Sequence, residues 1–420
     1  MTTRFARRME ALKASEIREI LKVTQRPEVI SFAGGLPAPE LFPVQALADV
    51  TQKILEEEGT RALQYSTTEG HPPLRSWIAA RLAAHGGGRF TADDILVTAG
   101  SQQGLDLTGK LFLDEGDVVL CESPTYLGAI SAWNVFRPRW VEVPTDDEGM
   151  VPEALGQLLG RHPNAKIVYV VPNFQNPSGR TWSLERRRSL MEVADRYDVF
   201  VVEDNPYGEL RFEGTPLPSI ASFDRAGRVI SLGTFSKVFC PGLRVGWVAA
   251  RSPLHEKLVI LKQGADLQTS TLTQMQVARY LAENDLDENI ARLIPVYRER
   301  RDAMLEALEK EMPAGVRFTR PAGGLFLWVQ LPEGVSARTL LDECLRHNVA
   351  FVPGGAFFPN GGHEETFRLN YSNMPVDRIR EGIRRLASAL DQLLLKRDRG
   401  TVQPGAEAAL SARADQESPD

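Results

Sequence analysis

Short apolar runs rich in β-branched residues recur between residues 94 and 250, with helical patterns between them. The runs are nearly continuous rather than alternating, which is typical of parallel strands buried on both faces of a sheet. The pattern predicts an α/β fold whose large domain has a mostly parallel, mixed sheet of seven strands between helices. The seven runs lie at residues 94–100, 117–123, 139–144, 166–172, 198–204, 228–233 and 244–250.

The chain after this region has a different pattern. A helical stretch at 274–312 precedes three strand-like segments, GGLFLWVQL, VAFVPGG and FRLNYS, with helices between them, which predicts a smaller α+β unit. We expect the small domain to combine an N-terminal helix and arm at 1–50 with residues 291–396. Residues 51–290 are expected to form the large domain, and the polar segment 397–420 a disordered tail.

Composition limits the possible partners. The 420 residues carry a formal net charge of −6, which argues against a general nucleic-acid or membrane binder and favours small-molecule substrates. Cys121, Cys240 and Cys344 are widely separated and odd in number, as expected of a protein in a reducing, cytoplasmic compartment without disulfides. The histidines and cysteines show no metal-ligand spacing, so no metal is expected.

Polar side chains gather just after several of the predicted strands. In an open parallel sheet, ligands bind beyond the carboxyl ends of the strands, so these side chains are expected near one another. Each residue alone also fits an ordinary structural role, such as a helix cap, a turn or a surface charge. Together they offer an amine, a carboxylate, a phenol, amides, hydroxyls and a guanidinium. They are Ser101, Gln102, Asn176, Asp204, Tyr207, Thr234, Ser236, Lys237 and Arg244.

This set of groups matches the needs of pyridoxal 5′-phosphate (PLP). Lys237 supplies the amine that condenses with the cofactor aldehyde, and Asp204 the carboxylate that keeps the ring nitrogen protonated. Tyr207 and Asn176 hold the ring oxygen. The phosphate is expected to bind Arg244, side-chain hydroxyls and the free backbone N–H groups at the start of a helix. The residues that provide these last groups are Ser101, Gln102, Thr234 and Ser236.

Four motifs carry a family resemblance: PNFQNPSG, EDNPYGEL, TFSKVFCPGLRVGW and FRLNYS. They resemble the signatures of the fold-type I, class I/II aminotransferases, and the similarity extends over residues 15–395. More narrowly, ALQYSTTEGHPPLR, TAGSQQGLDL and KQGADLQTS resemble the branch with 2-aminoadipate and kynurenine aminotransferases. The resemblance implies a homodimer with active sites at the subunit boundary. It also implies that Tyr126 stacks on the cofactor ring, Tyr65 reaches the partner's phosphate, and Arg368 holds the substrate α-carboxylate.

A dicarboxylic substrate needs a second cation besides Arg368. Arg18 matches the position that the 2-aminoadipate branch uses for the distal carboxylate, and a terminal helix is a plausible mobile carrier. Arg26 is instead expected to be a solvated surface charge. Gly34 and Gly35 would let the backbone approach the substrate, and Asn176 would also contact it.

The leading hypothesis is a dimeric aminotransferase that transfers amino groups between 2-amino acids and 2-oxo acids such as 2-oxoglutarate. One alternative keeps PLP but makes the reaction a lyase or decarboxylase reaction. Another is the sensor domain of a transcription regulator, although too few residues precede the fold-like region for an independent DNA-binding domain. The P-loop-like GLDLTGK at 104–110 is interpreted as chance, because it lies within a predicted helix.

Overall fold

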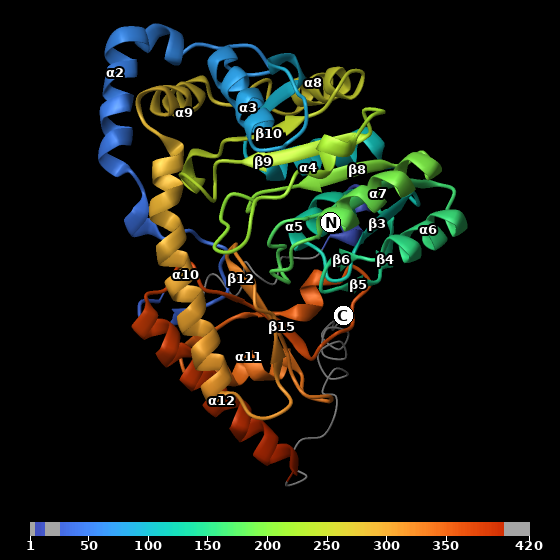
Figure 1. Ribbon diagram of the computed structural model, residues 1–420, viewed down its shortest axis with the longest axis vertical. Helices are drawn as coiled ribbons and strands as arrows, with labels where there is room; N and C mark the ends of the chain where they lie inside the picture. The colour runs from blue at the N-terminus through green and yellow to red at the C-terminus, as the bar shows by residue number, and fades with distance from the viewer. Residues whose placement is uncertain (1–4, 13–25, 399–420) are drawn as a thin grey trace, which may run out of the picture.

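The computed structural model describes residues 5–12 and 26–398. Figure 1 shows two units, a larger one around a central sheet and a smaller one near the C-terminal helix, with the long helix α10 (Leu286–Glu311) running between them. Within the described ranges, no helix is both long and apolar enough to cross a membrane.

The larger unit is built on a seven-stranded sheet with the order β2-β10-β9-β8-β7-β3-β4. β10 runs antiparallel to both of its neighbours, and the remaining pairs are parallel. The sheet therefore confirms the predicted α/β fold and its seven mixed strands. Their bounds are β2 (Ile95–Thr98), β3 (Val118–Glu122), β4 (Arg139–Val143), β7 (Ala165–Val170), β8 (Phe200–Asp204), β9 (Val229–Thr234) and β10 (Gly246–Ala249).

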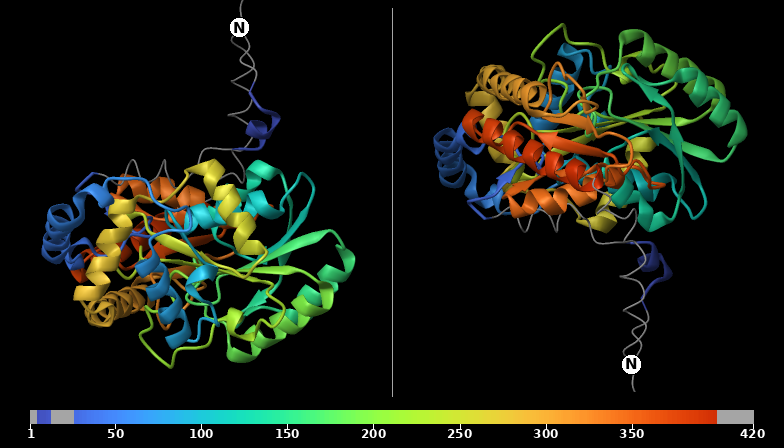
Figure 2. Two further views of the ribbon diagram at one scale, coloured as in Figure 1. Left: turned by 90° about the horizontal axis from the view of Figure 1, so that it is seen from above. Right: turned by 90° about the horizontal axis from the view of Figure 1, so that it is seen from below.

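Helices cover both faces of this sheet, which explains why its strands are continuously apolar. On β3, Val118 and Leu120 pack into one core cluster, and Val119 and Cys121 into the other. Helices α6 and α7, which contribute to the first cluster, lie side by side (Figure 2). The helices of this unit are α3 (Pro72–Ala84), α4 (Ser101–Phe112), α5 (Leu127–Trp133), α6 (Pro152–Arg161), α7 (Leu184–Tyr197), α8 (Leu254–Ala265) and α9 (Thr271–Glu283).

The smaller unit contains a four-stranded antiparallel sheet with the order β11-β12-β15-β14. Helices α11 and α12 pack against each other, and α12 also packs along α10. The elements of this unit are β11 (Arg317–Phe318), β12 (Phe326–Gln330), α11 (Ala337–Arg346), β13 (Val349–Ala350), β14 (Val352–Pro353), β15 (Thr366–Asn370) and α12 (Val376–Asp398).

The N-terminal arm joins the smaller unit before the chain enters the larger one. Strand β1 (Ile30–Ser31) pairs in parallel with β13, and the Asn370 amide donates to the Phe32 carbonyl at 2.9 Å. The chain continues into α2 (Val44–Ala62), which packs on α9. The domain boundaries predicted after residues 50 and 290 fall inside α2 and α10, so both helices continue across them.

The predicted terminal segments are described only in part. Arg7–Ala11 form a short 3-10 helix that contacts residues 134–136. The remainder of the predicted N-terminal helix, at 13–25, lies outside the described residues. The same is true of residues 399–420, which make up nearly all of the predicted tail.

Candidate active site

The predicted cofactor residues lie at the carboxyl edge of the large sheet. Asp204 is the last residue of β8, and Lys237 follows the end of β9. Asn176 lies in the loop after β7, while Arg368 comes from β15 of the smaller unit. The arm crosses this edge, because the Lys237 Nζ donates to the Gly35 carbonyl at 2.8 Å. The site is thus assembled from both units and the arm.

Asp204 is a buried carboxylate with two unlike oxygens. Its Oδ2 accepts a hydrogen bond from the Tyr169 hydroxyl at 2.9 Å. Its Oδ1 is buried and has no hydrogen-bond partner within the described residues. Burial raises the pKa of Asp204 to about 7, and the Tyr169 hydrogen bond and the Lys237 charge partly oppose this shift. Such an oxygen can accept a hydrogen bond from a donor group of a ligand.

Lys237 carries an amine that loses its proton unusually easily. Burial lowers its pKa to about 8, and the positive charges of Arg368 and Arg244 act in the same direction, while Asp204 opposes them. A neutral amine is a nucleophile and a base, whereas an ammonium is neither. The environment of Lys237 therefore favours the form that covalent chemistry requires.

Arg368 is only 3% exposed although it carries a guanidinium. It donates to the Asn176 Oδ1 at 2.8 Å and to the Ala33 carbonyl, and its guanidinium carbon lies 4.3 Å from the centre of the Phe326 ring. Burial lowers its pKa to about 10, and its Nε has no hydrogen-bond partner among residues 5–12 and 26–398. A buried cation with a free donor is suited to a carboxylate.

Two tyrosines complete the site, Tyr207 buried and Tyr126 half-buried. Tyr207 is hydrogen-bonded to Asn176, and its ring meets the Phe326 ring edge-on at 5.7 Å between centres. Burial raises the pKa of Tyr126 to about 12, so its hydroxyl stays protonated at neutral pH. A Cβ at Gly128 would lie 2.3 Å from the Tyr126 ring, so glycine is required there for the ring to adopt this position.

The start of α4 brings the Arg244 guanidinium next to the first turn of the helix. Gly100 precedes the helix with φ +79°, and a Cβ there would lie 2.4 Å from the Arg244 guanidinium. Arg244 is exposed and donates to the Ala99 carbonyl at 3.3 Å. Ser101 is the first helical residue, and the Gln102 side chain donates to the Gly128 carbonyl at 2.8 Å. Free N–H groups and a guanidinium therefore meet at one point, as a phosphate requires.

The hydroxyls of Thr234 and Ser236 are held in the turn that precedes Lys237. The Thr234 hydroxyl donates to the Ser236 Oγ at 2.9 Å and accepts from the Ser236 amide at 3.1 Å. Both residues are buried next to the site.

Tyr65, which is predicted to act on a partner subunit, lies apart from this cluster. The Tyr65 side chain is 79% exposed and hydrogen-bonds none of the site residues described above. An exposed aromatic ring is consistent with a contact to another subunit, which remains a prediction. Gly34 is buried beside Gly35 in the arm, whereas Arg18 lies outside the described residues.

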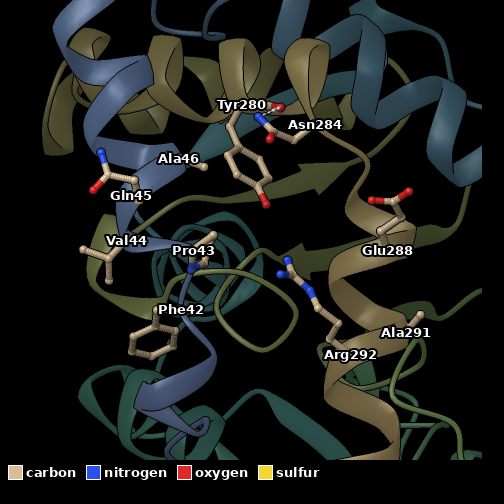
Figure 3. A pocket seen from close by; sticks show the side chains of 10 residues that line it. All are labelled: Phe42, Pro43, Val44, Gln45, Ala46, Tyr280, Asn284, Glu288, Ala291 and Arg292. Carbon is tan, nitrogen blue, oxygen red and sulfur yellow. Dashed lines mark hydrogen bonds between the residues drawn. The ribbon is translucent and has the colours of Figure 1, made fainter.

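A surface cavity of about 730 Å³ shares none of the predicted site residues. It is bounded by the start of α2, the end of α9 and the first turns of α10 (Figure 3). The Tyr280 hydroxyl points toward the Arg292 guanidinium across it, and the Tyr280 ring packs on Phe239 at 4.4 Å. None of the predicted catalytic groups lines this cavity.

The residues present fit PLP. The free Oδ1 of Asp204 suits a protonated ring nitrogen, and the Lys237 amine suits an aldehyde. Tyr207 with Asn176 offers donors to a ring oxygen, and the start of α4 with Arg244 offers donors to a phosphate.

Comparison with known proteins decides the family. The model of the family "Aminotransferase class I and II" matches residues 28–386. The chain belongs to this family. As an aminotransferase it uses PLP, which confirms the enzyme class and the cofactor predicted from the motifs.

Its similar relatives include enzymes with different amino donors. The aminotransferase is 46% identical to aromatic-amino-acid aminotransferase 1 of Thermococcus litoralis, over 93% of this chain and 95% of the relative. It is 48% identical to the 2-aminoadipate transaminase of Thermus thermophilus, over 91% and 95%. A crystal structure of α-aminoadipate aminotransferase from Thermus thermophilus, complexed with N-(5′-phosphopyridoxyl)-L-leucine, has a TM-score of 0.87 and 46% identity, and covers 93% of this chain and 98% of that one.

Sequence reasoning missed two buried groups around the aminotransferase site. One is Tyr169, whose phenol interrupts the aliphatic strand KIVYVV and needs a hydrogen-bond partner there. The other is Glu122, which accepts from the Val171 amide at 2.9 Å and the Trp182 indole at 2.8 Å. Burial raises the pKa of Glu122 to about 7. A polar residue inside an otherwise apolar strand is the signal that could have found both.

Proposed function

We propose that this aminotransferase moves the amino group of 2-aminoadipate or glutamate to 2-oxo acids such as 2-oxoglutarate, and also accepts leucine and aromatic donors. The observation that carries the proposal is the burial of Asp204 and Arg368 beside the half-buried Lys237, where one oxygen of the carboxylate and one nitrogen of the guanidinium lack protein partners within the described chain. The names of the two relatives and the bound leucine derivative support the choice of donors.

Each residue has a role that follows from its contacts. When bound, PLP supplies an aldehyde for the amino group and a ring that delocalises electrons from the substrate α-carbon. With PLP bound, the neutral amine of Lys237 would act as the base that moves the proton to and from the substrate α-carbon. Arg368 binds the α-carboxylate, and its Asn176 contact fixes the orientation of the guanidinium. Tyr207 and Asn176 would hold the ring oxygen of PLP, and Tyr126 would pack on its ring.

A panel of amino acids tested with 2-oxoglutarate and scored by kcat/KM identifies the preferred donor. A transaminase leaves the pyridoxamine form of the cofactor and one 2-oxo acid for each amino acid consumed. Release of carbon dioxide, or of a fragment of the substrate side chain, would instead establish the lyase or decarboxylase reaction.

Arg18 is proposed to bind the distal carboxylate of 2-aminoadipate, on the strength of the family resemblance. Losing a charge-assisted contact is worth roughly 10- to 150-fold in affinity. We therefore expect Arg18→Ala to lower kcat/KM for 2-aminoadipate by roughly 10- to 150-fold and to leave kcat/KM for leucine nearly unchanged. Half-reactions with each donor, followed by absorbance, keep the oxo-acid partner out of the measurement.

Arg26→Ala is the matched control, because Arg26 is an exposed arginine of the same segment. Arg26→Ala should leave kcat/KM unchanged for both 2-aminoadipate and leucine. An equal loss for 2-aminoadipate and leucine in Arg18→Ala would show that Arg18 is structural.

The active sites are proposed to be shared between the subunits of a homodimer, with Tyr65 acting on the partner's phosphate. Mixing inactive Tyr65→Phe and Lys237→Ala proteins should then restore activity, because one site of each heterodimer combines an intact Lys237 with the partner's intact tyrosine. Complete exchange would restore about one quarter of the wild-type activity, since half of the dimers are mixed and each has one intact site.

Mixing Lys237→Ala with Asp204→Asn provides the control. Both residues are contributed by the same subunit, so every site of that mixture lacks one of them. No recovery with Tyr65→Phe, despite subunit exchange shown by mass-tagged chains, would rule out a shared site.

A further inference from the structure

Tyr169 is a buried phenol in the middle of the large sheet, next to Asp204 but absent from the roles above. It lies on β7, and its hydroxyl donates to the Asp204 Oδ2 at 2.9 Å. We propose that Tyr169 is a positioning residue for the cofactor, which holds the Asp204 carboxylate so that Oδ1 faces the ring nitrogen of PLP. This inference rests on the role proposed for Asp204.

The two oxygens of Asp204 differ only because of Tyr169. Oδ2 is satisfied by the phenol, whereas Oδ1 is buried and has no partner in the described part of the chain. A buried carboxylate oxygen without a donor costs free energy, so a donor from a ligand is expected at that point. Without the phenol, the carboxylate could rotate and exchange its two oxygens. The Tyr169 hydrogen bond removes this freedom before the cofactor arrives.

The Tyr169 ring is fixed independently of its hydroxyl. Tyr169 is paired with Cys121 of β3 on one side and with Val202 of β8 on the other. Its ring and the Trp133 ring form a T-shaped contact, 5.3 Å between centres and 81° between planes, and the Trp133 indole donates to the Leu105 carbonyl at 2.7 Å. Removing only the hydroxyl therefore leaves the packing of the ring in place.

The charge on Asp204 depends on the same contact. Burial raises the pKa of Asp204, whereas the Tyr169 hydrogen bond lowers it. Burial and the Asp204 charge hold the pKa of Tyr169 well above its ordinary value, so the phenol remains a donor at neutral pH. Four groups face Asp204 from the surrounding elements: Tyr169 of β7, Lys237 after β9, Tyr126 at the start of α5 and Tyr207 after β8.

The test is Tyr169→Phe in the full-length protein, stripped of cofactor and titrated with PLP. The equilibrium Kd for PLP should rise roughly 10- to 100-fold near neutral pH, the effect of losing one hydrogen bond to a charged group. The pH at which binding is half-maximal should move upward, because the carboxylate then forms at higher pH. With ¹⁵N-labelled PLP, the nitrogen chemical shift should report a less protonated ring.

Tyr371→Phe is the matched control for losing a buried tyrosine hydroxyl. Tyr371 donates to the Gly323 carbonyl at 2.7 Å in the smaller unit, so this variant should lose thermal stability but keep the Kd and its pH dependence. In an Asp204→Asn background, Tyr169→Phe should change the Kd less than about twofold, because contacts that act through one group are not additive.

Site-specific 3-fluorotyrosine at position 169 keeps the test available if the phenylalanine variant does not fold. Its more acidic hydroxyl is a stronger donor, so the half-maximal pH should move downward. Unchanged Kd and nitrogen shift in Tyr169→Phe, or an effect of equal size in the Asp204→Asn background, would overturn the inference. Failure of the wild-type protein to bind PLP at all would overturn the proposed function instead.

Discussion

Replacing Lys237 with alanine is expected to abolish nearly all turnover and the visible absorbance of the lysine-bound cofactor. The amine has two tasks, covalent attachment of PLP and proton transfer at the α-carbon. General acid–base catalysis alone contributes about 10²- to 10⁴-fold, so kcat should fall by at least about 10³-fold. The low pKa of this amine, about 8, matches both tasks, because it makes the neutral form accessible near neutral pH. Single-turnover absorbance measurements check the loss.

Two further lysine variants separate the amine's chemistry from its charge. Lys237→Arg keeps a cation but cannot condense with an aldehyde, so it should be as inactive as the alanine variant. Lys257→Ala removes an exposed lysine on α8 and should retain wild-type activity. Borohydride reduction followed by peptide mapping should locate the adduct at Lys237 in the wild type. An adduct on another lysine in Lys237→Ala, with turnover retained, would disprove the assignment.

The sheet and the residues at its edge could be predicted because both depend on local sequence. A continuous apolar run such as 198–204 indicates a strand that is buried on both faces. Asp204 is the polar residue at which this run ends, so it could be placed at the end of the strand. The strands of a parallel sheet all have their carboxyl ends at the same edge. Lys237 and Asn176 could therefore be placed near Asp204 without coordinates.

The pairings within the site could not be predicted, because they join residues far apart in the chain. Tyr169 and Asp204 are separated by 35 positions, Arg368 and Asn176 by 192, and Lys237 and Gly35 by 202. No periodicity in the sequence encodes such contacts. The first depends on the register between β7 and β8, and the other two on how the smaller unit and the arm pack on the large sheet.

Asp204→Asn should lower turnover more than tenfold and weaken PLP binding. Asparagine keeps the shape of the side chain and can still accept from Tyr169, but it has no charge to hold a proton on the ring nitrogen. Losing one charge-assisted contact should cost more than about 1.4 kcal/mol, which corresponds to a factor of ten in rate. Single-turnover rates with saturating PLP separate the loss of chemistry from the loss of cofactor. Turnover within tenfold of the wild type would contradict the role of Asp204.

Glu203→Gln is the matched control, since Glu203 is the neighbouring buried carboxylate on β8. It accepts from the Ser219 hydroxyl at 2.7 Å and the Ile220 amide at 2.8 Å, away from the site. The control variant should lose thermal stability but retain its rate of transamination. Glu203→Gln losing transamination as severely as Asp204→Asn would mean that any disturbance of β8 impairs the enzyme.

The pH dependence of stability gives a second measure of Asp204, independent of turnover. Burial raises its pKa to about 7, above the ordinary value of about 4, so the cofactor-free folded protein binds this proton more tightly than the unfolded chain does. The stability that this proton contributes is fully present below about pH 4 and is lost as the pH rises to about 7. Asp204→Asn removes this titrating carboxyl group, so Tm should fall less steeply between about pH 4 and about pH 7 than it does in the wild type. An unchanged slope would mean that the carboxylate is already ionised in the cofactor-free site.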